Sequence, residues 1–140
     1  MPLQFHLSWS IYVRCANIAK FHRTHLPAIE QRIGVPPTGC EIVREDDSPG
    51  EIRAVTFTNH ETASREEAVS LALGKAGALY SGAWRINGLQ TIGEGMELYL
   101  YCLANVPKPL STPPALTTAL LEVGTGWVER TDAGWTFNED

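Results

Sequence analysis

Residues 3–15 alternate between apolar and polar side chains, and no other feature of the sequence constrains the fold as strongly. The apolar set is Phe5, Leu7, Trp9, Ile11, Val13 and Cys15. The intervening set is His6, Ser8, Ser10, Tyr12 and Arg14. Because successive side chains of a strand point to opposite faces, this pattern predicts a long, half-buried antiparallel strand. Other elements must then cover its apolar face.

The next segment, residues 16–33, changes to helical spacing. Its apolar face consists of positions three or four residues apart: Ile18, Phe21, His25, Ile29 and Ile33. Gly34 is suited to cap the C-terminus of this helix. Pro27 lacks the N–H that would reach the carbonyl of Arg23, so we expect either a kink or a new helix that begins at Pro27.

A hairpin and a second helix follow. Residues 40–45 and 51–59 are short β-branched runs joined by an acidic turn, which is typical of a β-hairpin. Ser64 and Glu67 form a capping box, which predicts a helix over 65–81. The small residues of this helix fall on one stripe and allow close approach to a sheet.

The last third of the chain predicts two more hairpins and a short helix. Residues 83–92 and 96–106 flank a glycine turn, and the second run is apolar on both faces, as a central strand would be. Residues 107–114 form a proline-rich connector. We expect a short helix over 115–124 and a hairpin over 127–137.

These elements predict an α+β fold: an antiparallel sheet with two helices packed on one face, plus a C-terminal helix and β-hairpin. The first six elements match the ferredoxin-like order βαββαβ. We expect residues 1–106 to form an α+β core domain. Residues 107–140, with the connector, short helix and hairpin, would pack on or extend that core.

Charge and cysteine content narrow the possible partners. The 140-residue chain has a net charge of −5. Because an acidic excess repels phosphate, we expect no nucleic-acid ligand. No stretch approaches the roughly 18 apolar residues that span a bilayer, so we expect no membrane partner. The cysteines, Cys15, Cys40 and Cys102, are odd in number and lack a CxxC motif, which favours free thiols in a cytoplasmic protein.

Residues 115–137 resemble the helix and β-hairpin that close a winged-helix domain. The resemblance covers about 25 residues, and a proline-rich connector stands where the preceding helices would be. A wing that grips phosphates is basic, whereas this segment is acidic, so the charge argues against DNA binding.

The sequence predicts no catalytic centre and no cofactor. It contains neither a GxSxG nucleophile elbow nor a phosphate-binding glycine loop. His22 and His25 have helical spacing and are weak candidates for metal ligands, but the apolar position of His25 favours a packed histidine. These patterns leave the question of an enzyme open and favour a protein without catalytic activity.

The polar face of the first strand is an alternative ligand site. His6, Ser10, Tyr12 and Arg14 project from this face, and His60 could join them. Hydroxyl, imidazole and guanidinium groups together could recognise a carboxylate or a phosphate. The solvent face of an ordinary sheet would show the same pattern.

Partner binding is the hypothesis that we favour from the sequence. Its expected contacts are the acidic turn and the tryptophans of the last hairpin: Glu45, Asp46, Asp47, Glu51, Trp127 and Trp135. The chain would be a small acidic cytosolic protein-binding domain, such as an inhibitor or immunity-type protein that blocks one basic protein partner. The alternatives are a small enzyme or ligand-binding domain that uses the polar face, and a structural subunit that forms a homodimer through the hairpin.

Overall fold

The computed structural model describes the chain except for residues 1, 35–38, 44–49, 91–98, 109–111 and 139–140. In chain order its elements are β1 (Leu3–Arg14), α1 (Ile18–Lys20), the π-helix η1 (Phe21–His25), α2 (Leu26–Ile33), β2 (Cys40–Val43), β3 (Glu51–Thr62), α3 (Arg65–Leu79), β4 (Arg85–Gln90), β5 (Tyr99–Asn105), β6 (Leu116–Thr125), β7 (Trp127–Thr131) and β8 (Gly134–Asn138).

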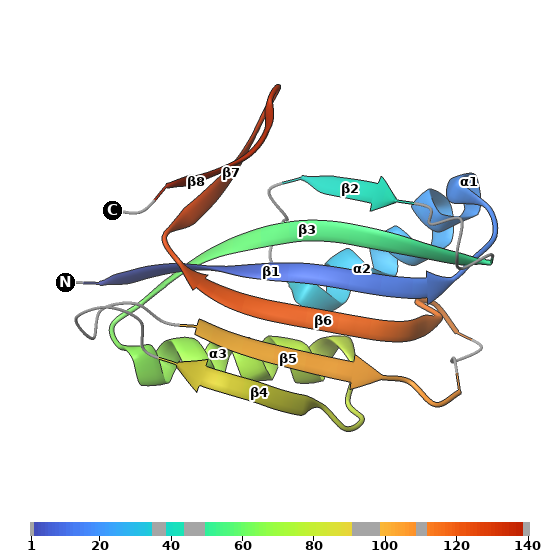
Figure 1. Ribbon diagram of the computed structural model, residues 1–140. Coiled ribbons are helices and arrows are strands. Elements are labelled where there is room, and N and C mark those ends of the chain that lie inside the picture. Colours follow the sequence, from blue (N-terminus) through green and yellow to red (C-terminus); the bar gives the residue numbers. More distant parts are fainter. Residues whose placement is uncertain (1, 35–38, 44–49, 91–98, 109–111, 139–140) are drawn as a thin grey trace.

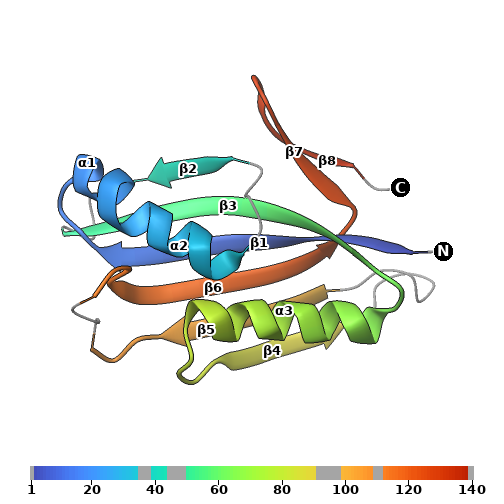
Figure 2. The same ribbon diagram turned by 180° about the vertical axis from the view of Figure 1, so that it is seen from behind.

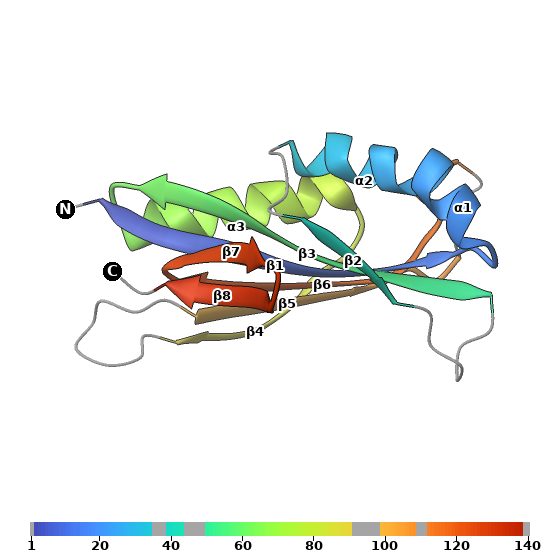
Figure 3. The same cartoon turned by 90° about the horizontal axis from the view of Figure 1, so that it is seen from above.

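The strands form a six-stranded sheet in the order β2-β3-β1-β6-β5-β4 and a separate two-stranded ribbon, β7-β8 (Figure 1). Every neighbouring pair is antiparallel. The helices cover one face of the six-stranded sheet (Figure 2). The β7-β8 hairpin lies on the other face (Figure 3). The predicted α+β class, with helices on an antiparallel sheet, is confirmed. The ferredoxin-like order is not confirmed, because β6 lies between β1 and the β4-β5 pair.

The predicted helix over residues 115–124 is wrong, because this segment forms the central strand β6. The register between β1 and β6 shifts at Tyr12 and Val13, and this irregularity separates the buried Leu116 from the buried Ala119 by three residues. In a sequence, apolar residues three positions apart are also typical of one face of a helix. From Ala119 onward the buried positions alternate as in any strand. The resemblance to a winged-helix domain therefore fails at its helix, whereas the hairpin that follows is present.

The segment from α1 to α2 shows how the helix accommodates Pro27, which has no backbone N–H to donate. Here the helix widens into the π-turn η1, in which the N–H of Leu26 donates to the carbonyl of Phe21. A new α-helical stretch begins at Leu26, so Pro27 occupies a first-turn position where no N–H is needed. Gly34 caps the C-terminus in the left-handed conformation, with φ of 81°.

The capping box of α3 is confirmed. The N–H of Glu67 donates to the Ser64 hydroxyl over 3.2 Å, and the Glu67 carboxylate accepts from the N–H of Ala63, also over 3.2 Å. The buried stripe of the helix is Ala68, Ala72, Ala76 and Leu79. These small side chains allow α3 to pack closely on the sheet.

The apolar side chains of β1 form the centre of the core. Phe5, Leu7, Trp9, Ile11 and Val13 are all fully buried between the sheet and the helices. The indole N–H of Trp9 donates to the hydroxyl of Thr58 on β3 over 3.3 Å, so its polar atom is also satisfied. Each such side chain contributes about 1.5–3 kcal/mol of transfer free energy.

Adjacent leucines on β6 provide a test of this alternation. Leu121 is fully buried beneath the helices, whereas Leu120 is half-buried on the opposite face. We expect Leu121→Ala to lower the free energy of unfolding by about 2–5 kcal/mol and Leu120→Ala by about 1 kcal/mol. Urea denaturation of both variants measures these losses. Equal losses would contradict the strand assignment.

Candidate functional site

The face of the six-stranded sheet away from the helices, here called the open face, carries the predicted polar residues of β1. Its half-buried side chains come from four strands: Ser8, Ser10, Tyr12, Arg53, Val55, Tyr101, Leu103, Thr118 and Leu120. The residues are therefore neither part of a packed core nor fully solvated.

Arg53 on β3 joins two of the predicted ligand-binding residues. Its Nε donates to the hydroxyl of Ser10 over 2.8 Å, and its guanidinium lies 5.7 Å from the ring centre of Tyr12. Arg14 lies at the exposed end of β1, the strand that carries Ser10 and Tyr12. Arg53 was not among the residues predicted from the sequence, although its register opposite Tyr12 follows from pairing the two alternating segments.

His60 lies on the other face of the sheet and does not join this group. Its ring stacks on Phe5 with 5.5 Å between ring centres, and its Nε2 lies 2.8 Å from the hydroxyl of Thr58. Burial, together with the positive charge of Lys75, lowers the pKa of His60 to about 4. The structure thus separates His60 from His6, Ser10, Tyr12 and Arg14, the residues with which it was predicted to form a ligand site.

The tryptophans of the C-terminal hairpin have different environments. Trp135 packs against Phe57 on the open face, with 4.5 Å between ring centres. The guanidinium of Arg130 lies 4.8 Å from the Trp135 ring centre and 3.7 Å from the Glu41 carboxylate. Trp127 remains 38% exposed. Trp135 therefore attaches the hairpin to the sheet, whereas Trp127 keeps part of its ring exposed.

The Asn59 side chain helps to hold the start of β7 beside β3. The amide Nδ2 of Asn59 donates to the carbonyl of Val128 over 2.8 Å, and the Val128 N–H donates to Oδ1 of Asn59 over 2.9 Å. Both backbone groups of Val128 are therefore hydrogen-bonded to the Asn59 side chain. This amide takes the place of the backbone groups that a neighbouring strand would supply. The buried Val128 side chain fixes the same point.

The start of the hairpin also buries His6, which is 8% exposed. His6 Nδ1 lies 3.1 Å from the carbonyl oxygen of Gly126. A carbonyl can only accept, so Nδ1 carries the proton and Nε2 keeps its lone pair. Burial lowers the pKa of His6, although the Gly126 carbonyl and the charge of Glu122 oppose this effect.

A pocket of about 190 Å³ opens beside His6. It is lined by residues of β1, β3, β6 and β8: His6, Ser8, Phe57, Glu122, Val123, Gly124 and Phe137. Gly124 is required here, because a Cβ at this position would lie 2.7 Å from both Nε2 and Cε1 of His6. The pocket combines a neutral imidazole, a hydroxyl and a carboxylate with two aromatic rings.

The two weak metal candidates, His22 and His25, lie in different environments. His25 is buried, its Nδ1 accepts from the N–H of Ala115 over 3.4 Å, and burial lowers its pKa. His22 is exposed. Within the ranges that the structure describes, no three His, Cys, Asp or Glu side chains gather closely enough to hold a metal ion. His25 is a packed histidine that tethers the chain before β6.

Of the four acidic residues predicted to contact a partner, the structure describes only Glu51. Glu45, Asp46 and Asp47 lie outside the described residues. Glu51 begins β3, and its carboxylate accepts a hydrogen bond from the hydroxyl of Thr117.

The three cysteines are free, as predicted. Burial raises the pKa of Cys40 to about 11 and also raises the pKa of Cys102. Neither thiol is therefore activated as a nucleophile.

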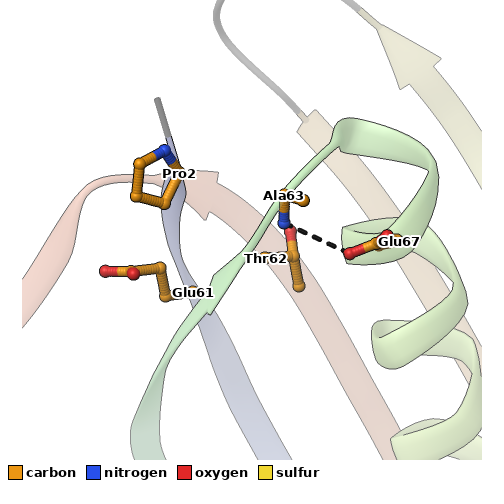
Figure 4. Close-up of a pocket in the computed structure, with 5 residues that line it drawn as sticks. All are labelled: Pro2, Glu61, Thr62, Ala63 and Glu67. Atoms are coloured by element: carbon orange, nitrogen blue, oxygen red, sulfur yellow. Dashed lines mark hydrogen bonds between the residues drawn. The ribbon is translucent and has the colours of Figure 1, made fainter.

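A second hollow, of about 500 Å³, lies where β3 meets α3 (Figure 4). It is lined by Pro2, Glu61, Thr62, Ala63 and Glu67. The Glu67 carboxylate already accepts from the N–H of Ala63, as part of the helix cap. The hollow therefore lies beside the capped N-terminus of α3.

No family model, curated protein or solved structure matches the chain. None of the helices in the described ranges is long and apolar enough to cross a membrane. The geometry of the open face and the hairpin is therefore the basis for the functional proposal.

Asn59→Ala should loosen the start of β7 and leave the six-stranded sheet intact. The variant removes both hydrogen bonds to Val128, so we expect the amide of Val128 to exchange its hydrogen faster. The amides of β1 that pair with β6 should keep their protection. Hydrogen exchange measured by NMR separates the two regions, and an unchanged rate at Val128 would contradict this role of Asn59.

The folded protein should lose stability as the pH falls from about 6.5 to about 4. Folding favours the neutral ring of His60, so its contribution is complete above the unfolded pKa and is lost toward the folded pKa. His60→Phe keeps an aromatic ring against Phe5 and cannot take up a proton. We expect this variant to show a shallower pH dependence of the unfolding free energy, by up to about one proton. Identical slopes in both proteins would contradict the burial of His60.

Proposed function

We propose that this chain is a small acidic, cytosolic protein-binding domain that docks one basic protein partner through the open face and the C-terminal hairpin. Inhibition of that partner, as by an immunity-type protein, is the activity that we favour. The observation that carries the proposal is that helices cover only one face of the sheet. The other face holds partly exposed side chains beside a projecting hairpin.

The composition of this surface supports docking of a protein. The open face mixes aromatic, aliphatic and polar side chains, including Tyr12, Tyr101 and Leu120, which are all half-buried. On the hairpin, Trp127 is 38% exposed and Phe137 is 56% exposed. Aromatic residues of this kind are enriched among the residues that dominate binding energy at protein interfaces.

The charge of the chain supports a basic partner. A net charge of −5 accelerates encounter with a positively charged protein and repels nucleic acid. Burial raises the pKa values of the Cys40 and Cys102 thiols, which argues against these two groups as nucleophiles. A protein that acts by docking needs no activated nucleophile.

Capture with the full chain as bait, from a lysate of its native host, should identify the partner. Its affinity is then measured by calorimetry with purified proteins. We expect Trp127→Ala to weaken binding by at least about tenfold, because exposed tryptophans are frequent hot spots. The matched control is Leu73→Ala on the outer side of α3, since Leu73 and Trp127 are each 38% exposed. This control should bind like the wild type.

Added salt should weaken the complex, because attraction between opposite charges is screened. Equal losses in Trp127→Ala and Leu73→Ala would contradict docking through the hairpin. A concentration-dependent dimer in sedimentation experiments, without any partner, would instead support self-association through the hairpin.

A further inference from the structure

We propose that the pocket beside His6 receives an arginine side chain of the basic partner. The inference rests on the proposed docking function and names the chemical group that anchors it. The pocket is lined by side chains of β1, β3, β6 and the hairpin, so a side chain of a protein docked on the open face could enter it.

The polar groups of the pocket are acceptors for a cation. Nδ1 of His6 is occupied by the Gly126 carbonyl, so Nε2 presents a lone pair. Glu122 adds an exposed carboxylate, and Ser8 lies directly opposite Glu122 in the β1–β6 register. A guanidinium carries five N–H donors in a planar fork and can satisfy an imidazole and a carboxylate together.

The aromatic groups of the pocket suit the same ligand. Phe137 lies edge-on to His6 with 5.5 Å between ring centres, and Phe57 lies edge-on to Phe137 at 5.6 Å. Phe137 is 56% exposed and so presents ring surface to an incoming group. Guanidinium groups stack favourably on aromatic faces.

Other ligand classes fit the pocket less well. An anion would be repelled by the carboxylate of Glu122. A metal ion requires more donors, and no group of three metal-binding side chains occurs among the described residues. The absence of a side chain at Gly124 leaves room for the His6 ring in this pocket, because a Cβ there would lie 2.7 Å from the ring.

An NMR titration of the full, ¹⁵N-labelled chain tests this assignment. The probe is Nα-acetyl-arginine amide, and its neutral analogue Nα-acetyl-citrulline amide has nearly the same shape. We expect saturable shifts at the amides of Ser8, Gly124 and Phe137 with the arginine probe. The citrulline probe should bind at least about tenfold more weakly, because it lacks the charge.

Two variants locate the binding. Glu122→Gln removes the charge of an exposed side chain, so we expect the same dispersed spectrum and about tenfold weaker binding of the arginine probe. Glu129→Gln, at an exposed position of β7, is the matched control and should bind like the wild type. Equal affinity for both probes, or no effect of Glu122→Gln, would overturn the assignment.

The outcome is separable from that of the docking proposal. If the partner needs Trp127 but the arginine probe does not bind the pocket, docking stands and the anchor is rejected. If the probe binds at Glu122 but Trp127→Ala leaves partner affinity unchanged, the pocket is a cation site and docking through the hairpin is rejected.

Discussion

Burial of the apolar side of β1 is the constraint on which the rest of the structure depends. Its five core side chains are fully buried, and the strand pairs with β3 on one edge and β6 on the other. All helices must then pack on the side where these residues point. The opposite face carries a mixture of polar, aromatic and aliphatic side chains, because alternation along a strand assigns every second residue to it. The one-sided sheet and its open face thus have the same origin.

The hairpin is attached to that open face by a few specific contacts. Asn59 satisfies the backbone of Val128, Phe57 receives Trp135, and the Gly126 carbonyl accepts from His6. Two residues of these contacts, His6 and Phe57, also line the pocket beside His6, together with Phe137 of the hairpin. The placement of the hairpin therefore affects both the pocket and the proposed docking surface.

Local patterns were sufficient to predict β1, the Gly34 cap, the capping box of α3 and the hairpins β2-β3 and β7-β8. The prediction failed at β6, where an irregular register placed Leu116 and Ala119 at helical spacing. The candidate site was harder to predict than the fold. The pairing of His6 with Gly124 depends on a contact between distant segments, and the placement of His60 depends on which face of β3 meets the helices. Neither leaves a local pattern in the sequence.

The position of β6 also bears on how the chain reaches its native state during synthesis. β1 is synthesised before β6, the strand that completes its second edge and begins at Leu116. The nascent chain therefore exposes an unpaired edge of β1 until β6 has been made. Such edges recruit other chains, and contacts between distant segments slow folding. The nascent protein should consequently depend on chaperones more than a domain of this size with local contacts would.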